Sequence, residues 1–362
     1  MPARREEPSL FGHSPLDRAM EIVAPAPVSP ESMQIAAALG PRLRLGTSSW
    51  SFPGWRGFVY APKAPASEIA SRGLAAYAHH PLHATVGLDR SFYETPSIDT
   101  LRALAEQVPS NFRFMVKAHQ ACARPYLQSD GSTLGDVAAA RRHGACNPRF
   151  LDPTWATDAV VGPIVEGLGA NCGPILFQFA HLPIGKGEMI ASAQALLDQL
   201  DVFLSGLPKG PRYALEFRND SMLRGENCRR FAQVLQAHAA IPGIGLLPSM
   251  PSAARQAVAL REAGLDPVRQ PLLLVRWLLG HGLGYEEARS AYEPFDRLAA
   301  PDAASRHEIA ALVAACLAAG GEAFVIVNNK AEGSAPRSIP PLAESIRVAL
   351  AKAHQNSEPM PS

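Results

Sequence analysis

The stretch YALEFRND, residues 213–220, places Glu216 and Arg218 two positions apart at the end of an apolar run. Side chains two positions apart lie on the same face of a strand. Because desolvating an unpaired charge is costly, charged side chains in an otherwise buried strand indicate ion-pair partners or a ligand. The stretch therefore predicts a buried strand that ends at a polar site.

Seven similar apolar runs flank this stretch, and most lack polar alternation, which is typical of parallel strands covered on both faces. Segments with helical spacing separate them; in one, Ser305 and Glu308 have capping-box spacing and Gly320 ends the pattern. Eight strands alternating with helices favour a (β/α)8 TIM barrel. An open doubly wound sheet is the alternative, but no GxGxxG fingerprint follows the first run. The seven runs are 43–48, 84–89, 112–117, 175–180, 244–248, 271–277 and 324–329.

Composition limits the classes of function. The chain has 362 residues, 47% of them hydrophobic, which is enough for one large core. A formal net charge of +1 gives no overall basic field, so general binding to nucleic acid or to a membrane surface is not predicted. Five scattered cysteines indicate neither a disulfide framework nor a zinc site and favour the cytoplasm. We find no secretory signal and no apolar segment long enough to span a membrane.

The chain divides into an arm, a barrel and a tail. Residues 1–40 mix charges with Pro and Ser and predict a flexible, loosely packed N-terminal arm. Residues 41–353 predict a single barrel domain, and residues 354–362 a C-terminal tail. Within the barrel, residues 121–154 form a polar insertion after the third strand. A long loop there lies on the ligand-binding face, so it is either a partial lid or a contact between subunits.

Polar side chains gather at the ends of the predicted strands. Because the carboxyl ends of parallel barrel strands share one mouth, these residues become neighbours. Cations outnumber carboxylates among them, and this balance suits a phosphate or carboxylate ligand. The predicted catalytic residues are Glu216, Lys117 and His119, and the predicted substrate-binding residues are Trp50, Asp89, Arg90, Tyr93, Gln178, Arg218, Arg276, Asn328, Asn329 and Lys330.

The candidate catalytic residues each have a structural alternative. Glu216 is a general base or one half of an ion pair with Arg218 in the barrel interior. Lys117 neutralises Glu216, anchors an anion or forms a Schiff base. His119 is a general base or a hydrogen-bonded loop histidine. Asp89, His119 and Glu216 could hold a divalent metal ion on separate strands, but their spacing does not indicate one.

The candidate binding residues have similar alternatives. Asn328 and Asn329 either cap the last strand and its turn or orient a sugar or phosphate oxygen beside Lys330. Trp50 either packs in the core or forms a stacking wall for a ring-shaped substrate. Tyr93 is equally consistent with a core residue whose hydroxyl is satisfied.

The motifs LGTSSWSFPGW, FRFMVKA, ILFQF, YALEFRN, VRW and VNN, in this order, resemble those of the domain of unknown function 72 family, the YecE-like proteins. The resemblance covers roughly residues 43–350 and implies a TIM-barrel fold without a settled reaction. The family's E-x-N-x-x-F-Y pattern at the second strand is replaced here by GLDRSFY, with Gly87 and Asp89 at the Glu and Asn positions. The matching positions are Gly46, Trp50, Tyr93, Lys117, Gln178, Glu216, Arg218, Arg276 and Asn328.

These observations favour an enzyme, a hydrolase or an isomerase, acting on a small anionic or hydroxylated substrate such as a sugar phosphate or nucleotide fragment. A non-catalytic protein that binds a phosphate or carboxylate ligand, or a regulatory protein, is the main alternative. A nucleic-acid-processing enzyme is a third, because Arg141, Arg142 and His143 give the insertion a short basic segment.

Overall fold

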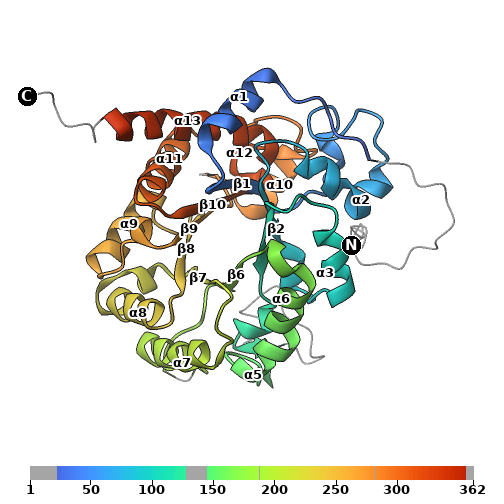
Figure 1. Ribbon diagram of the computed structural model, residues 1–362. Coiled ribbons are helices and arrows are strands. Elements are labelled where there is room, and N and C mark those ends of the chain that lie inside the picture. Colours follow the sequence, from blue (N-terminus) through green and yellow to red (C-terminus); the bar gives the residue numbers. More distant parts are fainter. Residues whose placement is uncertain (1–22, 128–144, 187, 281, 356–362) are drawn as a thin grey trace, which may run out of the picture.

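Eight parallel strands close into a barrel, which confirms the predicted TIM-barrel fold. The structure, a computed structural model, describes residues 23–127, 145–186, 188–280 and 282–355. Neighbouring strands follow the closed order β1-β10-β9-β8-β7-β6-β3-β2, and helices surround them (Figure 1). Each predicted run overlaps one strand, and β6, β8 and β10 begin two or three residues before the predicted run. The strands are β1 Leu43–Thr47, β2 Thr85–Leu88, β3 Arg113–Lys117, β6 Cys172–Phe179, β7 Tyr213–Phe217, β8 Ile241–Leu246, β9 Leu272–Trp277 and β10 Glu322–Val327.

Several helices, among them α1, α3, α7 and α9, begin at a serine whose side chain accepts from an N–H group of the first turn. In α11, Asp302 Oδ1 accepts from Ser305 N at 2.9 Å, so Asp302 is the N-cap. The predicted capping box at Ser305 and Glu308 is therefore wrong, and Glu308 instead accepts from the N–H of Ala254. The helices are α1 Pro30–Leu39, α2 Ala66–Ala78, α3 Ile98–Ala105, α5 Pro153–Ala156, α6 Gly162–Leu168, α7 Ala193–Gly206, α8 Gly225–Ala237, α9 Ala253–Glu262, α10 Tyr285–Tyr292, α11 Ala303–Ala318, α12 Asn329–Glu332 and α13 Ala335–Gln355.

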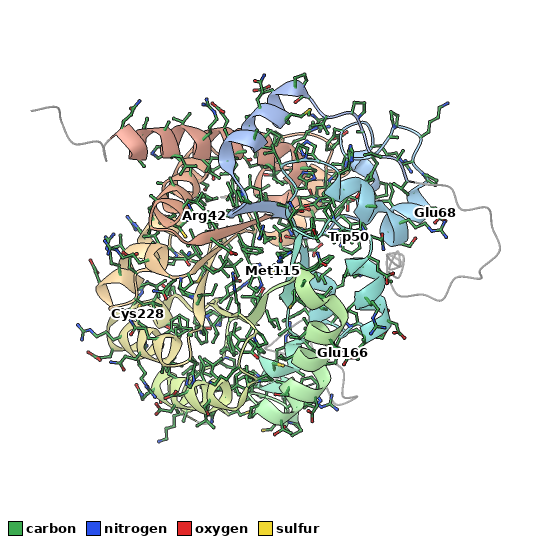
Figure 2. All side chains as sticks on the ribbon, in the orientation of Figure 1. Arg42, Trp50, Glu68, Met115, Glu166 and Cys228 are labelled. Carbon is green, nitrogen blue, oxygen red and sulfur yellow. The ribbon has the colours of Figure 1, made fainter. Side chains whose placement is uncertain are left out.

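Apolar side chains fill the lower part of the barrel interior. Met115 lies among the strands at its centre (Figure 2). Because side chains alternate along a strand, the residue two positions later points to the same interior. Lys117 therefore follows Met115, and Gln178 and Arg276 follow apolar interior residues in the same way, so a polar layer lies above an apolar plug. The plug consists of Met115, Leu176, Ala214, Ile241, Leu272, Leu274, Phe324 and Ile326.

Strands β1 and β2 approach each other closely. A Cβ atom on Gly46 would lie 1.9 Å from the carbonyl oxygen of Thr85, so only glycine fits at this position. The buried hydroxyl of Tyr77, on α2, accepts from Thr47 N at 2.9 Å and donates to Thr85 O at 3.0 Å. One side chain thus satisfies backbone groups of both strands.

The N-terminal segment departs from its prediction. Within the arm predicted over residues 1–40, α1 is capped by Ser29, buries Ile35 and Leu39 and packs against α13 (Figure 1). The expectation of a loosely packed arm is therefore wrong for residues 23–40, because the apolar stripe of α1 finds a partner helix far along the sequence. Residues 1–22 lie outside the described part.

The insertion contains a short antiparallel pair, β4 Tyr126–Leu127 with β5 Ala145–Cys146. Residues 128–144 between these strands lie outside the described residues, so the lid stays a prediction. The predicted tail over 354–362 begins inside α13, and its residues 356–362 also lie outside the described part. Among the described residues, no helix is both long and apolar enough to cross a membrane.

Replacing Tyr77 with Phe tests the link between β1 and β2. The variant leaves the Thr47 N–H buried without its acceptor, and we expect the free energy of unfolding to fall by about 1–3 kcal/mol. Urea unfolding followed by circular dichroism measures the change. A fall below about 0.5 kcal/mol would show that the hydroxyl does not contribute to this seam.

Candidate functional site at the mouth of the barrel

The buried guanidinium of Arg276, on β9, joins carboxylates from two other parts of the barrel. Its Nη1 donates to Glu216 Oε2 at 2.9 Å, and its Nη2 donates to Asp89 Oδ1 at 3.2 Å. Glu216 on β7 has no exposed surface and Arg276 only 1%. Asp89 begins the short 3-10 helix η2 Asp89–Phe92, which directly follows β2. The pairs therefore connect the C-terminal ends of β2, β7 and β9.

Gln178 and Arg218 complete this network. Gln178, paired with Glu216 in the β6–β7 register, accepts from Arg276 Nη1 at 3.0 Å and from Arg218 Nη2 at 2.9 Å. Arg218 Nε lies 3.3 Å from Glu216 Oε1. On β8, Gly245 leaves space for the carboxylate, because a Cβ atom there would lie 3.1 Å from Glu216 Cδ. We refer to Asp89, Lys117, Gln178, Glu216, Arg218 and Arg276 as the mouth cluster.

Lys117 differs from the two arginines because no carboxylate pairs with it. Its Nζ lies 3.6 Å from the centre of the Phe92 ring, a cation–π contact, and no described carboxylate lies within ion-pair distance of it. The side chain keeps 9% of its surface exposed. Burial lowers the pKa of Lys117 to about 7; Asp89 and Glu216 oppose this effect, and the charges of Arg276 and Arg218 reinforce it. Lys117 can therefore gain or lose a proton near neutral pH.

Glu216 has the opposite electrostatic environment. Burial alone would raise its pKa, but the charges of Arg276 and Arg218 outweigh burial and hold the pKa below its ordinary value. A carboxylate held ionised by two guanidinium groups is a weak proton acceptor. The geometry therefore favours the predicted alternative in which Glu216 belongs to an interior ion-pair layer.

A small cavity adjoins the mouth cluster at Asp89. Its volume is about 50 Å³, which is room for a few water molecules. Ser48 lines the cavity, and its Oγ is buried without a hydrogen-bond partner among the described residues. Gly87 also lines it, at the position where the resembled family has Glu, so the cavity occurs where the sequence departs from that pattern. The lining residues are Ser48, Ser49, Trp50, Gly87, Leu88, Asp89, Arg90, Ser91, Pro96 and Leu104.

His119 is held by backbone groups on both ring nitrogens. Nδ1 accepts from Ala121 N at 3.1 Å, and Nε2 lies 3.0 Å from the carbonyl oxygen of Tyr93. The ring also packs edge-on against Trp155. Burial lowers the pKa of His119. These contacts favour the loop-histidine alternative, since neither nitrogen is left to accept a substrate proton.

Asn328 and Asn329 have local structural roles. Asn328 caps α12 through its Oδ1, which accepts from Lys330 N, and Asn329 Oδ1 accepts from Ala335 N. These contacts favour the predicted capping alternative. Lys330 is largely buried, with its Nζ 4.0 Å from the centre of the Tyr285 ring.

The two aromatic candidates lie in different environments, Trp50 in the core and Tyr93 at the surface. Trp50 is buried, donates from Nε1 to Ala70 O and borders the small cavity (Figure 2). Tyr93 is 69% exposed, so its interpretation as a core residue is wrong. It follows η2, whose Phe92 turns into the core while Tyr93 turns to solvent. Arg90 lines the same cavity as Trp50.

Two residues near Lys117 were not predicted. Phe92 supports the Lys117 ammonium on its ring, and Arg124 lies with its guanidinium carbon 5.4 Å from the same ring. Arg124 Nε and Nη1 are buried and have no hydrogen-bond acceptor among the described residues. The sequence signal for Phe92 was its place after a strand end. Arg124 lies in the insertion, where sequence spacing does not indicate position.

The described residues offer no metal site: they contain no group of three or more His, Cys, Asp or Glu side chains that could hold an ion. Asp89, His119 and Glu216 are thus not brought together as a ligand set. Arg141, Arg142 and His143 lie outside the described residues, so the nucleic-acid alternative gains no support from them.

Comparison with known proteins adds the family. The family described as "Protein of unknown function DUF72" matches residues 44–362. A solved DUF72 family protein from Thermotoga maritima MSB8 is 19% identical with a TM-score of 0.55, over 83% of this chain and 98% of that chain. Another, from Enterococcus faecalis V583, is 17% identical with a TM-score of 0.53, over 85% and 95%. At these identities the structures show a shared fold alone. No curated protein matches the chain.

Replacing Glu216 with Gln tests the ion-pair layer. The variant leaves the buried Arg276 with Asp89 as its single carboxylate, and we expect the free energy of unfolding to fall by about 3–5 kcal/mol at pH 7. The wild-type advantage is present above the ordinary Glu pKa of 4.5 and is lost as pH falls through the lower folded-state pKa. Glu322→Gln, which breaks the more exposed pair with Arg212, is the control and costs less than about 1 kcal/mol. Equal losses in the two variants would exclude a special role for the buried pair.

Replacing Lys117 with Met is expected to stabilise the protein. The unfolded lysine stays protonated to about pH 10.5 and the folded one to about pH 7, so the wild type gains stability as pH rises between these values. Met removes the cost of burying the ammonium, and at pH 7 we expect a gain of roughly 2–5 kcal/mol. Urea unfolding from pH 6 to 10 measures it, with exposed Lys209→Met as the control that keeps the wild-type slope. Destabilisation at pH 7 would mean that Lys117 is a structural partner of the carboxylates.

Proposed function

The chain belongs to the DUF72 family, whose description names no reaction, and we propose that it is an enzyme acting on a small anionic substrate at the barrel mouth. A sugar phosphate or a nucleotide fragment has the expected chemistry, and either hydrolysis or isomerisation is compatible with it. The C-terminal ends of the strands are where barrel enzymes bind their substrates. The mouth cluster lies at this end.

The observation that carries the proposal is the charge balance of the mouth cluster. Both carboxylates, Asp89 and Glu216, already pair with Arg276. Lys117 therefore adds a positive charge without a carboxylate of its own. Burying an ammonium in this way costs folding free energy, and such costs are typical of functional sites. An incoming anion would supply the missing charge.

Arg218 is the residue best placed to meet that anion. Its Nε and Nη2 hold Glu216 and Gln178, while its Nη1 makes no hydrogen bond to the described residues. The side chain keeps 27% of its surface exposed. A guanidinium fixed along one edge and open along the other presents donors in a defined direction. We assign anion binding to Arg218.

Lys117 is the residue that we assign to proton transfer. A group whose pKa lies near the working pH exchanges protons most effectively, and burial brings the pKa of Lys117 to about 7. Glu216 and Asp89 then act as positioning residues that orient Arg276 and Arg218. This assignment replaces Glu216 with Lys117 as the proposed general base.

A non-catalytic binding protein is the second candidate. It is favoured by the pairing of both cluster carboxylates with arginines, which gives Asp89 and Glu216 a structural role. Product assays on any ligand that stabilises the protein separate the two candidates. We also propose a cytoplasmic location, which the five unpaired cysteines support.

Replacing Arg218 with Gln tests the anion site. Inorganic phosphate at about 10 mM should raise the Tm of the wild type by roughly 2–5 °C, because a ligand that binds only the folded state stabilises it. The variant should lose most of this rise. Differential scanning fluorimetry at pH 6.5 measures both.

Arg212→Gln is the matched control. Arg212 precedes β7 at the opposite end of the same strand and also pairs with one glutamate, Glu322. The control should keep the phosphate-dependent rise. If phosphate raises the Tm of all three proteins equally, the anion binds elsewhere and the proposal fails.

A further inference from the structure

We propose that Lys117 is a nucleophile whose amine forms an imine with an aldehyde or ketone that carries a phosphate or carboxylate group. The inference rests on the proposed function for the binding of the anionic group. It goes further by naming the reacting atom of the protein and the carbonyl class of the substrate.

The geometry at Lys117 leaves its nitrogen without a carboxylate partner among the described residues. Its Nζ rests on the hydrocarbon ring of Phe92 and makes no hydrogen bond to a described residue. The charged groups that interact with it electrostatically are Asp89 after β2, Glu216 on β7, Arg218 directly after β7, and Arg276 on β9. Both carboxylates form ion pairs with guanidinium groups. Neither lies within ion-pair distance of the Lys117 nitrogen.

Burial, which Asp89 and Glu216 oppose in part, favours the neutral amine. Burial lowers the pKa of Lys117 to about 7, so a large share of the side chain is neutral at physiological pH. An ordinary exposed lysine is almost entirely protonated at that pH. A desolvated lysine beside other cations is a recognised form of activated amine nucleophile.

The step balances without an added oxidant or reductant. The Nζ lone pair attacks the carbonyl carbon, and the π electron pair of the C=O bond moves to oxygen. A proton passes from nitrogen to that oxygen and gives a carbinolamine. Loss of water, with removal of the second N–H proton, leaves a C=N double bond between Lys117 and the former carbonyl carbon.

The anionic group of the substrate provides selectivity. Arg218 presents its open edge at the mouth, directly after β7, while Lys117 lies at the end of β3. In the proposed complex, the carbonyl lies at the amine of Lys117 and the anionic group at Arg218. Neutral carbonyl compounds lack the second contact.

Borohydride trapping tests the inference on the full-length protein. Glycolaldehyde phosphate and neutral glycolaldehyde are the matched probes, each incubated at pH 7.5 with sodium cyanoborohydride and followed by peptide mass spectrometry. We expect reductive labelling of Lys117 by the phosphate probe at least about tenfold faster than of exposed Lys63 and Lys209, because more of its amine is neutral. The labelling rate should rise with pH through about 7, as the ammonium loses its proton.

Two variants separate this inference from the proposed function. Lys117→Arg should remove the label but keep the cation, and Arg218→Gln should abolish the preference for the phosphate probe. Labelling of Lys117 no faster than of Lys63 overturns the imine inference, even if phosphate still raises the Tm through Arg218. Fast labelling of Lys117 by both probes alike, without a phosphate-dependent Tm rise, overturns the anion site and leaves the nucleophile.

Discussion

The bridge from Arg276 to Glu216 and Asp89 is the interaction on which the mouth of the barrel depends. It joins the ends of β2, β7 and β9 through a guanidinium that is almost wholly buried. A buried charge is tolerated only when partners compensate it, so each member requires the others. Two neighbouring residues accommodate the buried charges. Gly245 leaves space for the Glu216 carboxylate, and Gln178 accepts hydrogen bonds from Arg218 and Arg276. The neighbouring side chains are therefore arranged around a fixed ionic frame.

The strands and the buried part of the mouth cluster could be predicted from sequence, because both follow from strand periodicity. In each of four apolar runs, a polar side chain lies two positions after an inward-facing residue and so points to the same interior. Because the strands are parallel, these side chains, Lys117, Gln178, Glu216 and Arg276, become neighbours. His119 could not be placed in this way. Its ring is engaged by the backbone of Tyr93 and Ala121, and such contacts depend on loop geometry that periodicity does not encode. The packing of α1 was not predicted for a related reason: its partner helix, α13, lies at the other end of the chain.

The distribution of charge separates the roles of the ionic residues. Asp89 and Glu216 fix the arginines, and the pKa of Glu216 is held low by them. Lys117 receives no such pair and lies on an aromatic ring instead. A protein that needed only a stable barrel would place an apolar side chain at this position, since burying an unpaired ammonium is unfavourable. The proposed chemistry at the amine would account for a lysine at this position.

Under the proposed function, the same arrangement would polarise a bound substrate through fixed charges. Fixed guanidinium groups need no reorganisation when negative charge develops nearby, and a water-poor surrounding strengthens their field. Arg218 contributes a partly exposed positive charge to that field, and Arg276 contributes a buried one. Arg124, with two buried N–H groups that lack acceptors among the described residues, extends the donor set beyond the strands. An anion entering this mouth would meet donors already in place, while the amine of Lys117 remains the group able to react.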